Sequence, residues 1–156
     1  MRKSGKAGIF LFIVTLLLVL SFTNTAFCSD LILNDLKSKP VNLSALTGKP
    51  AILFFWTTWC PYCRAELKVL NKMYPQMEEE GLAIFAIDVG EAGYKVERFL
   101  KDNPLLNINI LLDPEGKAAE KYGLNGVPTY IFINKDGKVV SLEHSLPADY
   151  KNLLLK

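Results

Sequence analysis

Two cysteines, Cys60 and Cys63, are the residues whose type and spacing point most directly to chemistry. They form a C-x-x-C motif directly after the apolar run 51–56, so they lie between a predicted buried strand and a predicted helix. Such a pair can alternate between dithiol and disulfide, or it can contribute two ligands to a metal ion. The third cysteine, Cys28, is distant in the sequence, so the pattern does not indicate a framework of structural disulfides.

Pro61 predicts which cysteine is the nucleophile. Proline is favoured at the first position of a helix, which places Cys60 at the N-cap. There the free backbone N–H groups and the helix dipole stabilise a thiolate. Cys63 lies one turn into the helix and faces back toward Cys60. We therefore expect Cys60 to attack a substrate disulfide and Cys63 to resolve the mixed disulfide that forms.

Metal-binding and peroxidase alternatives use the same cysteines. A structural zinc site needs two further ligands, and only His144 and one leader cysteine remain, so we expect no metal and no cofactor. A copper-binding chaperone for oxidase assembly, with Cys60, Cys63 and His144 as ligands, stays open as the alternative function. A peroxidase would use Thr57 and Cys60 as a Thr-x-x-Cys motif, but Leu53 stands where that family has a proline.

The first 28 residues have the pattern of a bacterial-type secretory signal. Residues 2–6 are basic, residues 8–20 are almost wholly apolar, and residues 21–26 are mostly small and polar. Three fates of this leader stay open: cleavage after Cys28, lipidation at Cys28, or retention as a membrane anchor. Phe27 disfavours lipidation, and the apolar run is shorter than the ~20 residues that a membrane span needs.

Length and charge limit the function classes. The chain has 156 residues, enough for the leader and one domain. Its formal net charge is +2, but the leader carries three basic residues and no acid, which leaves −1 for the remainder. A domain so close to neutral has no electrostatic footprint for nucleic acid. We expect no nucleic-acid partner.

The remaining sequence predicts an α/β domain over residues 29–156, with a mixed sheet covered by helices on both faces. Expected strands cover 31–33, 41–43, 51–56, 82–89, 108–112, 129–133 and 138–142. Expected helices run from Pro61 up to Gly81, around 96–100, over 117–122 and over 147–155.

Residues 31–143 resemble the thioredoxin superfamily, in particular its TlpA/ResA-like exported branch. The matching pieces are Val41-Asn42-Leu43-Ser44, Gly48-Lys49, Phe55-Trp56, Trp59-Cys60-x-x-Cys63, Glu66, Tyr122-Gly123, Gly126-Val127-Pro128-Thr129 and Asp136-Gly137-Lys138. The resemblance implies a thioredoxin-like fold and a redox disulfide between the two cysteines. It also implies that Pro128 follows a cis peptide bond and faces them, and that substrate backbone pairs with Val127.

Glu66 enters through the same resemblance. Thioredoxins carry an acid six residues before the first cysteine, where this chain has Phe54. The resemblance makes Glu66 the candidate proton acceptor for Cys63, against the plainer interpretation of a solvated helix glutamate. Around the nucleophile, Trp59, Pro61 and Tyr62 are the expected substrate-binding residues, with Val127 and Pro128 across from them.

The resemblance further implies an extracytoplasmic thiol–disulfide oxidoreductase, in the bacterial periplasm or on the outer face of the membrane. Its expected partners are exported protein disulfides or dithiols and a membrane thiol–disulfide electron donor. We expect the reducing direction, as in cytochrome c maturation. The pair Pro61-Tyr62 is similar to that of glutaredoxins, which are more oxidising than thioredoxin, so the direction of electron flow stays open.

Overall fold

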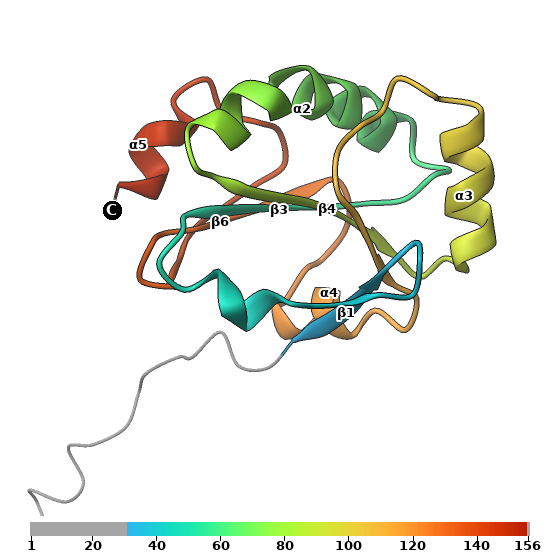
Figure 1. Cartoon of the computed structure of the whole chain (residues 1–156), viewed down its shortest axis with the longest axis horizontal. Helices are drawn as coiled ribbons and strands as arrows, with labels where there is room; N and C mark the ends of the chain where they lie inside the picture. Colours follow the sequence, from blue (N-terminus) through green and yellow to red (C-terminus); the bar gives the residue numbers. More distant parts are fainter. Residues whose placement is uncertain (1–30, 156) are drawn as a thin grey trace, which may run out of the picture.

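The computed structural model describes residues 31–155, which form a seven-stranded sheet with helices on both faces (Figure 1). Its strand order is β2-β1-β5-β4-β3-β6-β7, in which β3, β4 and β5 run parallel and the other neighbours run antiparallel. The elements are β1 Ile32–Asp35, β2 Pro40–Asn42, the 3-10 helix η1 Leu43–Leu46, β3 Ala51–Trp56, α2 Pro61–Glu79, β4 Ala83–Val89, α3 Gly93–Lys101, β5 Ile110–Asp113, α4 Lys117–Lys121, β6 Thr129–Ile133, β7 Val139–Glu143 and α5 Tyr150–Leu154. This mixed α/β architecture is the predicted thioredoxin-like fold.

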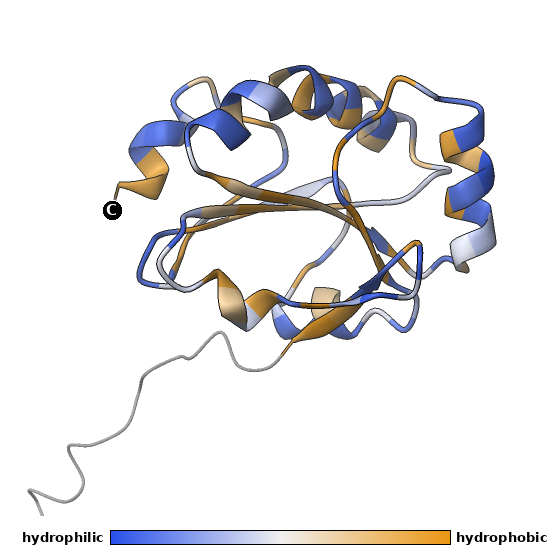
Figure 2. Ribbon diagram, in the orientation of Figure 1, coloured by the Kyte–Doolittle hydropathy of each residue, from blue (hydrophilic) through white to orange (hydrophobic). Residues whose placement is uncertain are grey.

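Strand β3 is the centre of the core, and all six of its residues are fully buried. Its apolar run has no alternation because helices cover both faces of this part of the sheet. Phe54 belongs to the cluster beneath α2, α3 and α5, whereas Leu53 and Phe55 belong to the cluster on the side of η1 and α4. Figure 2 shows mainly hydrophobic strands at the centre, and hydrophilic and hydrophobic residues alternating along α2 and α3.

Helix α2 packs on the sheet through one apolar stripe. Its buried residues recur every three or four positions, which is the spacing of one helix face. They are Cys63, Leu67, Leu70, Tyr74 and Met77. Pro61 begins the helix, as predicted. Because the apolar stripe packs on the sheet, the N-terminus of α2 is held at the end of β3.

The structure differs from the sequence-based prediction at the ends of elements. Helix η1 was not expected, and Asn42 caps it by accepting a hydrogen bond from the Ser44 amide at 2.9 Å. Helix α5 begins at Tyr150, later than the expected start at residue 147. The leader over residues 1–28 lies outside the described residues, so its predicted boundary stays a prediction.

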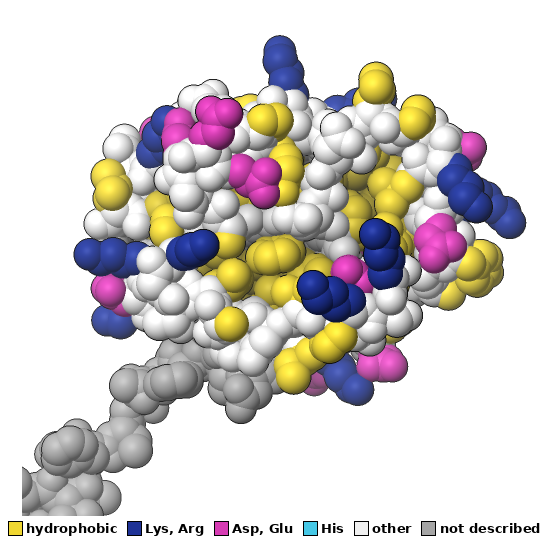
Figure 3. Space-filling view, in the orientation of Figure 1, with side chains coloured by type: hydrophobic (Ala, Val, Ile, Leu, Met, Phe, Trp, Pro, Cys, Tyr) yellow, Lys and Arg dark blue, Asp and Glu magenta, His cyan; other side chains and the backbone are white. Residues whose placement is uncertain are grey.

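Over residues 31–155 no helix combines the length and apolarity that crossing a membrane requires. Lys, Arg, Asp and Glu side chains are interspersed over the face seen in Figure 3. This mixture agrees with the near-neutral charge expected for the domain.

Candidate active site

The structure brings Cys60 and Cys63 together at the N-terminus of α2, where a disulfide joins them with their Cα atoms 5.2 Å apart. Cys60 is the N-cap, and its Sγ accepts a hydrogen bond from the Cys63 amide at 3.2 Å. The Arg64 amide donates to the Cys60 carbonyl oxygen at 3.1 Å, which is the first bond of the helix. In the reduced protein the same N–H group and the helix dipole would stabilise a Cys60 thiolate.

The two cysteine residues differ slightly in exposure to solvent. Cys60 is 6% exposed, whereas Cys63 is completely buried beneath the helix. Trp59 and Tyr62 are 69% and 79% exposed, so two aromatic side chains flank the accessible cysteine. Large exposed aromatic residues are typical of surfaces that contact protein partners.

The loop before β6 supplies a further wall beside the end of β3. Its Val127–Pro128 peptide bond is cis, as the resemblance implied. Within the described residues, the Val127 backbone makes no hydrogen bond, so its amide and carbonyl are free to pair with a bound chain. His144 is exposed, as expected, and its Nδ1 lies 2.9 Å from the Pro128 carbonyl oxygen.

Glu66 is half-buried and held in place rather than loosely solvated. Its Oε2 accepts hydrogen bonds from the Tyr130 hydroxyl at 3.0 Å and from the Leu146 amide at 3.1 Å. Burial and the Glu66 carboxylate raise the pKa of Tyr130 well above its usual range, so the hydroxyl stays a donor. Because residues three apart are neighbours on a helix, Glu66 lies on the side of α2 next to Cys63.

Glu91 is a functional candidate that the sequence analysis missed. It follows β4 and is 5% exposed. Its two carboxylate oxygens accept hydrogen bonds from the Thr58 amide at 2.6 Å and the Thr58 hydroxyl at 2.9 Å. Thr58 stands two residues before Cys60, so Glu91 fixes the loop that carries this cysteine.

Asp88 lies behind that loop at the end of β4 and is completely buried. It is paired in register with Trp56, and neither of its carboxyl oxygens has a hydrogen-bond partner among the described residues. Burial raises the pKa of Asp88 to about 8, and the carboxylates of Glu91 and Asp113 add to the shift. An acid inside the apolar segment 83–89 was the sequence signal for this group.

The copper-binding alternative would use Cys60, Cys63 and His144 as ligands. Within 31–155, no group of three or more His, Cys, Asp and Glu side chains is arranged to hold a metal ion. The Nδ1 atom of His144 is directed to the Pro128 carbonyl oxygen instead.

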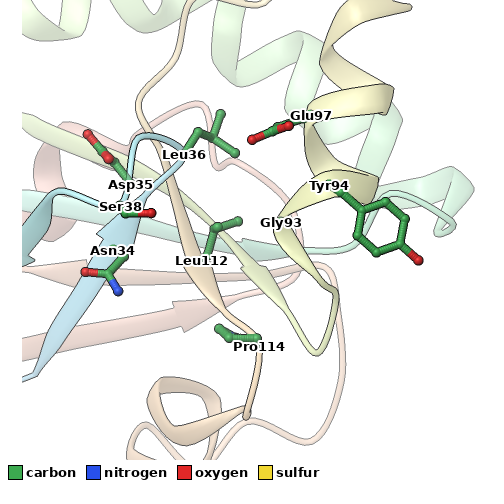
Figure 4. Close-up of a pocket in the computed structure, with 9 residues that line it drawn as sticks. All are labelled: Asn34, Asp35, Leu36, Ser38, Gly93, Tyr94, Glu97, Leu112 and Pro114. Carbon is green, nitrogen blue, oxygen red and sulfur yellow. The ribbon is translucent and has the colours of Figure 1, made fainter.

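A hollow of about 320 Å³ lies between the β1–β2 hairpin and the start of α3 (Figure 4). Leu36 and Glu97 point toward each other across it, while Tyr94 points away. Neither cysteine nor the cis proline lines it. A larger hollow of about 510 Å³ is lined by Pro61, the residue after Cys60, and therefore lies beside the disulfide.

The sequence matches the description "AhpC/TSA family" over residues 24–142, which is most of the chain. It is also 33% identical over 130 residues to the thiol-disulfide oxidoreductase ResA of Bacillus subtilis, covering 80% of this chain and 72% of that protein. The chain belongs to the AhpC/TSA family. Within it, the chain is 35% identical over 111 residues to ResA of Bacillus cereus, covering 71% of this chain but 64% of the relative's length.

Solved structures of similar proteins have the same fold as this member of the AhpC/TSA family. A candidate thiol:disulfide interchange protein DsbE from Chlorobium tepidum is 29% identical, with a TM-score of 0.71 over 85% of this chain and 94% of that one. The exposed lipoprotein thioredoxin of Streptococcus pneumoniae is 26% identical, with a TM-score of 0.71 over 80% and 98%. The thioredoxin-like architecture is therefore shared along nearly the whole described domain.

Proposed function

We propose that the protein is a thiol–disulfide oxidoreductase that exchanges disulfides with exported protein substrates through Cys60 and Cys63. The observation that carries the proposal is the position of Cys60 at the N-cap of α2, with its sulfur accepting the Cys63 amide. Relatives named thiol-disulfide oxidoreductase ResA support the activity. The free backbone of Val127 beside the cis Pro128 supports a polypeptide as the substrate.

The reaction is two successive thiol–disulfide exchanges. The Cys60 thiolate attacks one sulfur of a substrate disulfide and forms a mixed disulfide, and the second substrate sulfur leaves as a thiolate. Cys63 then loses its proton and attacks the Cys60 sulfur. This step forms the intramolecular disulfide and releases the first substrate sulfur as a thiolate. Two electrons pass from the protein dithiol to the substrate, and Glu66 accepts the Cys63 proton.

We place the reaction outside the cytoplasm and in the reducing direction. The basic and apolar pattern of residues 1–28 supports export. The resemblance of residues 31–143 to the TlpA/ResA-like branch implies reduction of exported cysteine pairs, as in cytochrome c maturation, with a membrane thiol–disulfide protein resupplying electrons. A reduction potential below about −230 mV, more reducing than the glutaredoxin range, would agree with this direction. A potential near that of the strong oxidants, about −120 mV, would contradict it.

Trapping tests the function and identifies the substrate. The Cys63→Ser variant keeps the nucleophile but lacks the resolving thiol, so mixed disulfides should accumulate on Cys60. Expressed with its leader in the exporting host, it should yield disulfide-linked adducts that disappear on reduction. The variant Cys60→Ser/Cys63→Ser is the matched control and should yield none. Equal adducts from both variants, or none from either, would contradict the proposal.

A further inference from the structure

We propose that a groove beside the redox site binds an acidic segment of the substrate polypeptide, close to the cysteine that Cys60 attacks. The proposal rests on the proposed disulfide exchange and adds a substrate class to it. The groove, here called the basic groove, has a volume of about 510 Å³. Its lining residues are Pro61, Arg64, Ala65, Lys68, Phe99, Asp102 and Asn103.

The basic groove and the cis-proline loop lie on opposite sides of the nucleophile. Strand β3, whose end leads to Cys60, has β6 as one neighbour and β4 as the other. Pro128 precedes β6, whereas α3, which supplies Phe99, follows β4. A chain that pairs with Val127 on one side of its cysteine would therefore continue over Pro61 into the basic groove on the other side.

The positive charge of the basic groove comes from residues along one edge of α2. Arg64, Lys68 and Lys72 are exposed and spaced four residues apart, which places them in a row on the helix surface. Figure 3 shows basic side chains projecting above α2. Within residues 31–155 the ion pairs are Lys117–Glu115 and Lys151–Glu80, so no member of the row has an ion-pair partner there.

This row has no evident structural purpose. Like charges four residues apart destabilise a helix, and no carboxylate among the described residues forms an ion pair with any of the three. Asp102, on the opposite wall, is the single acid that lines the groove against two cations, Arg64 and Lys68. The unpaired positive charge on one wall is therefore complementary to a carboxylate that enters from outside.

The walls of the groove are held in place before any partner binds. The Phe99 ring packs against Trp56, with 5.3 Å between the ring centroids. The side-chain amide of Asn103 donates to the Phe99 carbonyl oxygen at 2.8 Å. From α2, Asn71 donates to the Leu105 carbonyl oxygen at 3.0 Å, which ties the loop after α3 to the helix. A preformed site loses less conformational freedom on binding.

The shape favours a polypeptide over an anionic membrane. The row on α2 could reach a flat lipid surface, but such a surface would not enter a hollow that has Phe99 among its lining residues. An extended chain can place one carboxylate against Lys68 and an apolar side chain against Phe99. The exposed rings of Trp59 and Tyr62 extend the same contact surface toward Cys60.

Peptide reduction by the reduced full-length protein tests the proposal. The probes are short peptides with an internal Cys-Ala-Ala-Cys disulfide and Asp, Ser or Lys at the flanking positions. Each rate is divided by the rate at which neutral dithiothreitol reduces the same peptide, which removes the intrinsic reactivity of the disulfide. We expect the Asp peptide to be favoured over the Lys peptide by roughly tenfold at low ionic strength, and the preference to decline in 1 M salt.

Lys68→Glu is the informative variant because Lys68 is one turn further from the sulfurs than Arg64. It should abolish or reverse the order of the Asp and Lys peptides, a ratio in which a general change of thiol reactivity cancels. Lys135→Glu is the matched control. It makes the same charge change on an exposed residue after Ile133, at the end of the sheet opposite Cys60, and should keep the preference.

Three results distinguish failure of the proposed exchange activity from failure of the basic-groove proposal. If no peptide is reduced, including the Ser peptide, the proposed exchange activity itself is wrong. If all peptides are reduced equally, or Lys68→Glu keeps the parental order, the exchange activity stands and the basic groove does not select acidic segments. If there is no peptide preference but the parent binds phosphatidylglycerol vesicles and Lys68→Glu does not, the row on α2 is a membrane contact and our inference is overturned.

Discussion

The Tyr130 hydroxyl donates a hydrogen bond to Oε2 of Glu66 at 3.0 Å, and this contact joins strand β6 to helix α2 across 64 residues of sequence. The Leu146 amide donates to the same oxygen at 3.1 Å. Both donors bind Oε2, and among residues 31–155 no hydrogen bond to Oε1 is found. The fold thus holds the carboxylate in one orientation, which is what a proton acceptor requires.

Replacing Glu66 with Gln should slow the resolution step. Glutamine keeps an oxygen that can accept from Tyr130, but it cannot take the Cys63 proton. We expect resolution of the mixed disulfide to slow by about 10²-fold, the usual scale of general base catalysis. Loss of the negative charge should also lower the pKa of the neighbouring thiols. Stopped-flow exchange and thiol titration measure the two effects separately.

Glu79→Gln, at the exposed far end of α2, is the control for this change. It should alter neither the exchange rate nor the thiol titration. If Glu66→Gln behaves like Glu79→Gln in both measurements, Glu66 is a structural link to Tyr130 and takes no part in proton transfer.

The difference in burial between the cysteines predicts selective alkylation. Cys60 is 6% exposed and Cys63 is completely buried, so limiting iodoacetamide should label Cys60 in the reduced protein. Peptide mapping distinguishes these sites from each other and from Cys28. Preferential labelling of Cys63 would reverse the assignment of nucleophile and resolving thiol.

Local sequence rules were sufficient for the parts of the site that depend on local geometry. Pro61 predicted the start of α2, and with it the N-cap position of Cys60. The unbroken apolar run 51–56 predicted a strand buried on both faces, and β3 has those bounds. In both cases the structural determinant lies within a few residues of the group that it positions.

The missed groups depend on contacts between distant segments. Thr58 and Glu91 are 33 residues apart, and their contact requires β4 to lie beside β3. Asp88 was inside a correctly predicted strand, but its complete burial follows from having both β3 and β5 as neighbours. His144 was correctly expected to be exposed, yet the hairpin β6–β7 also brings it to the Pro128 carbonyl oxygen. Strand order, which the element prediction did not include, decides the first two contacts, whereas the third follows from the β6–β7 hairpin.

The contact between Glu91 and Thr58 predicts that replacing Glu91 lowers both the stability of the protein and the rate of disulfide exchange. Glu91→Gln replaces a charged acceptor of two bonds to Thr58 with an amide that accepts through one oxygen. The free energy of unfolding should fall by about 1–3 kcal/mol, and exchange through Cys60 should slow because its loop is less fixed. Denaturation of both proteins should be measured at one fixed pH, pH 6, which lies below the folded-state pKa of Asp88 of about 8.

Glu97→Gln provides the comparison for Glu91, because Glu97 is an exposed glutamate on α3 without a hydrogen bond to the cysteine loop. Its unfolding free energy and exchange rate should match those of the parent. A Glu91→Gln protein with parental stability and rate would mean that the loop keeps its position without this carboxylate.

Asp88 predicts a pH-dependent loss of stability that its replacement removes. Its folded-state pKa of about 8 lies above its ordinary value of 3.8, with burial as the main cause. Between these two values the folded protein keeps a proton that the unfolded chain releases, so stability falls as pH rises. The slope is at most about 1.4 kcal/mol per pH unit, and it ends once Asp88 ionises in the folded protein as well.

Asp88→Asn has no proton to release, so its stability relative to the parent should increase from pH 4 to pH 8 and then level off. Asp136→Asn, on the exposed β6–β7 turn, is the matched control because it makes the same Asp-to-Asn change away from Asp88. Urea denaturation at several pH values measures both, and a constant difference for Asp88→Asn would mean that Asp88 is already ionised at neutral pH.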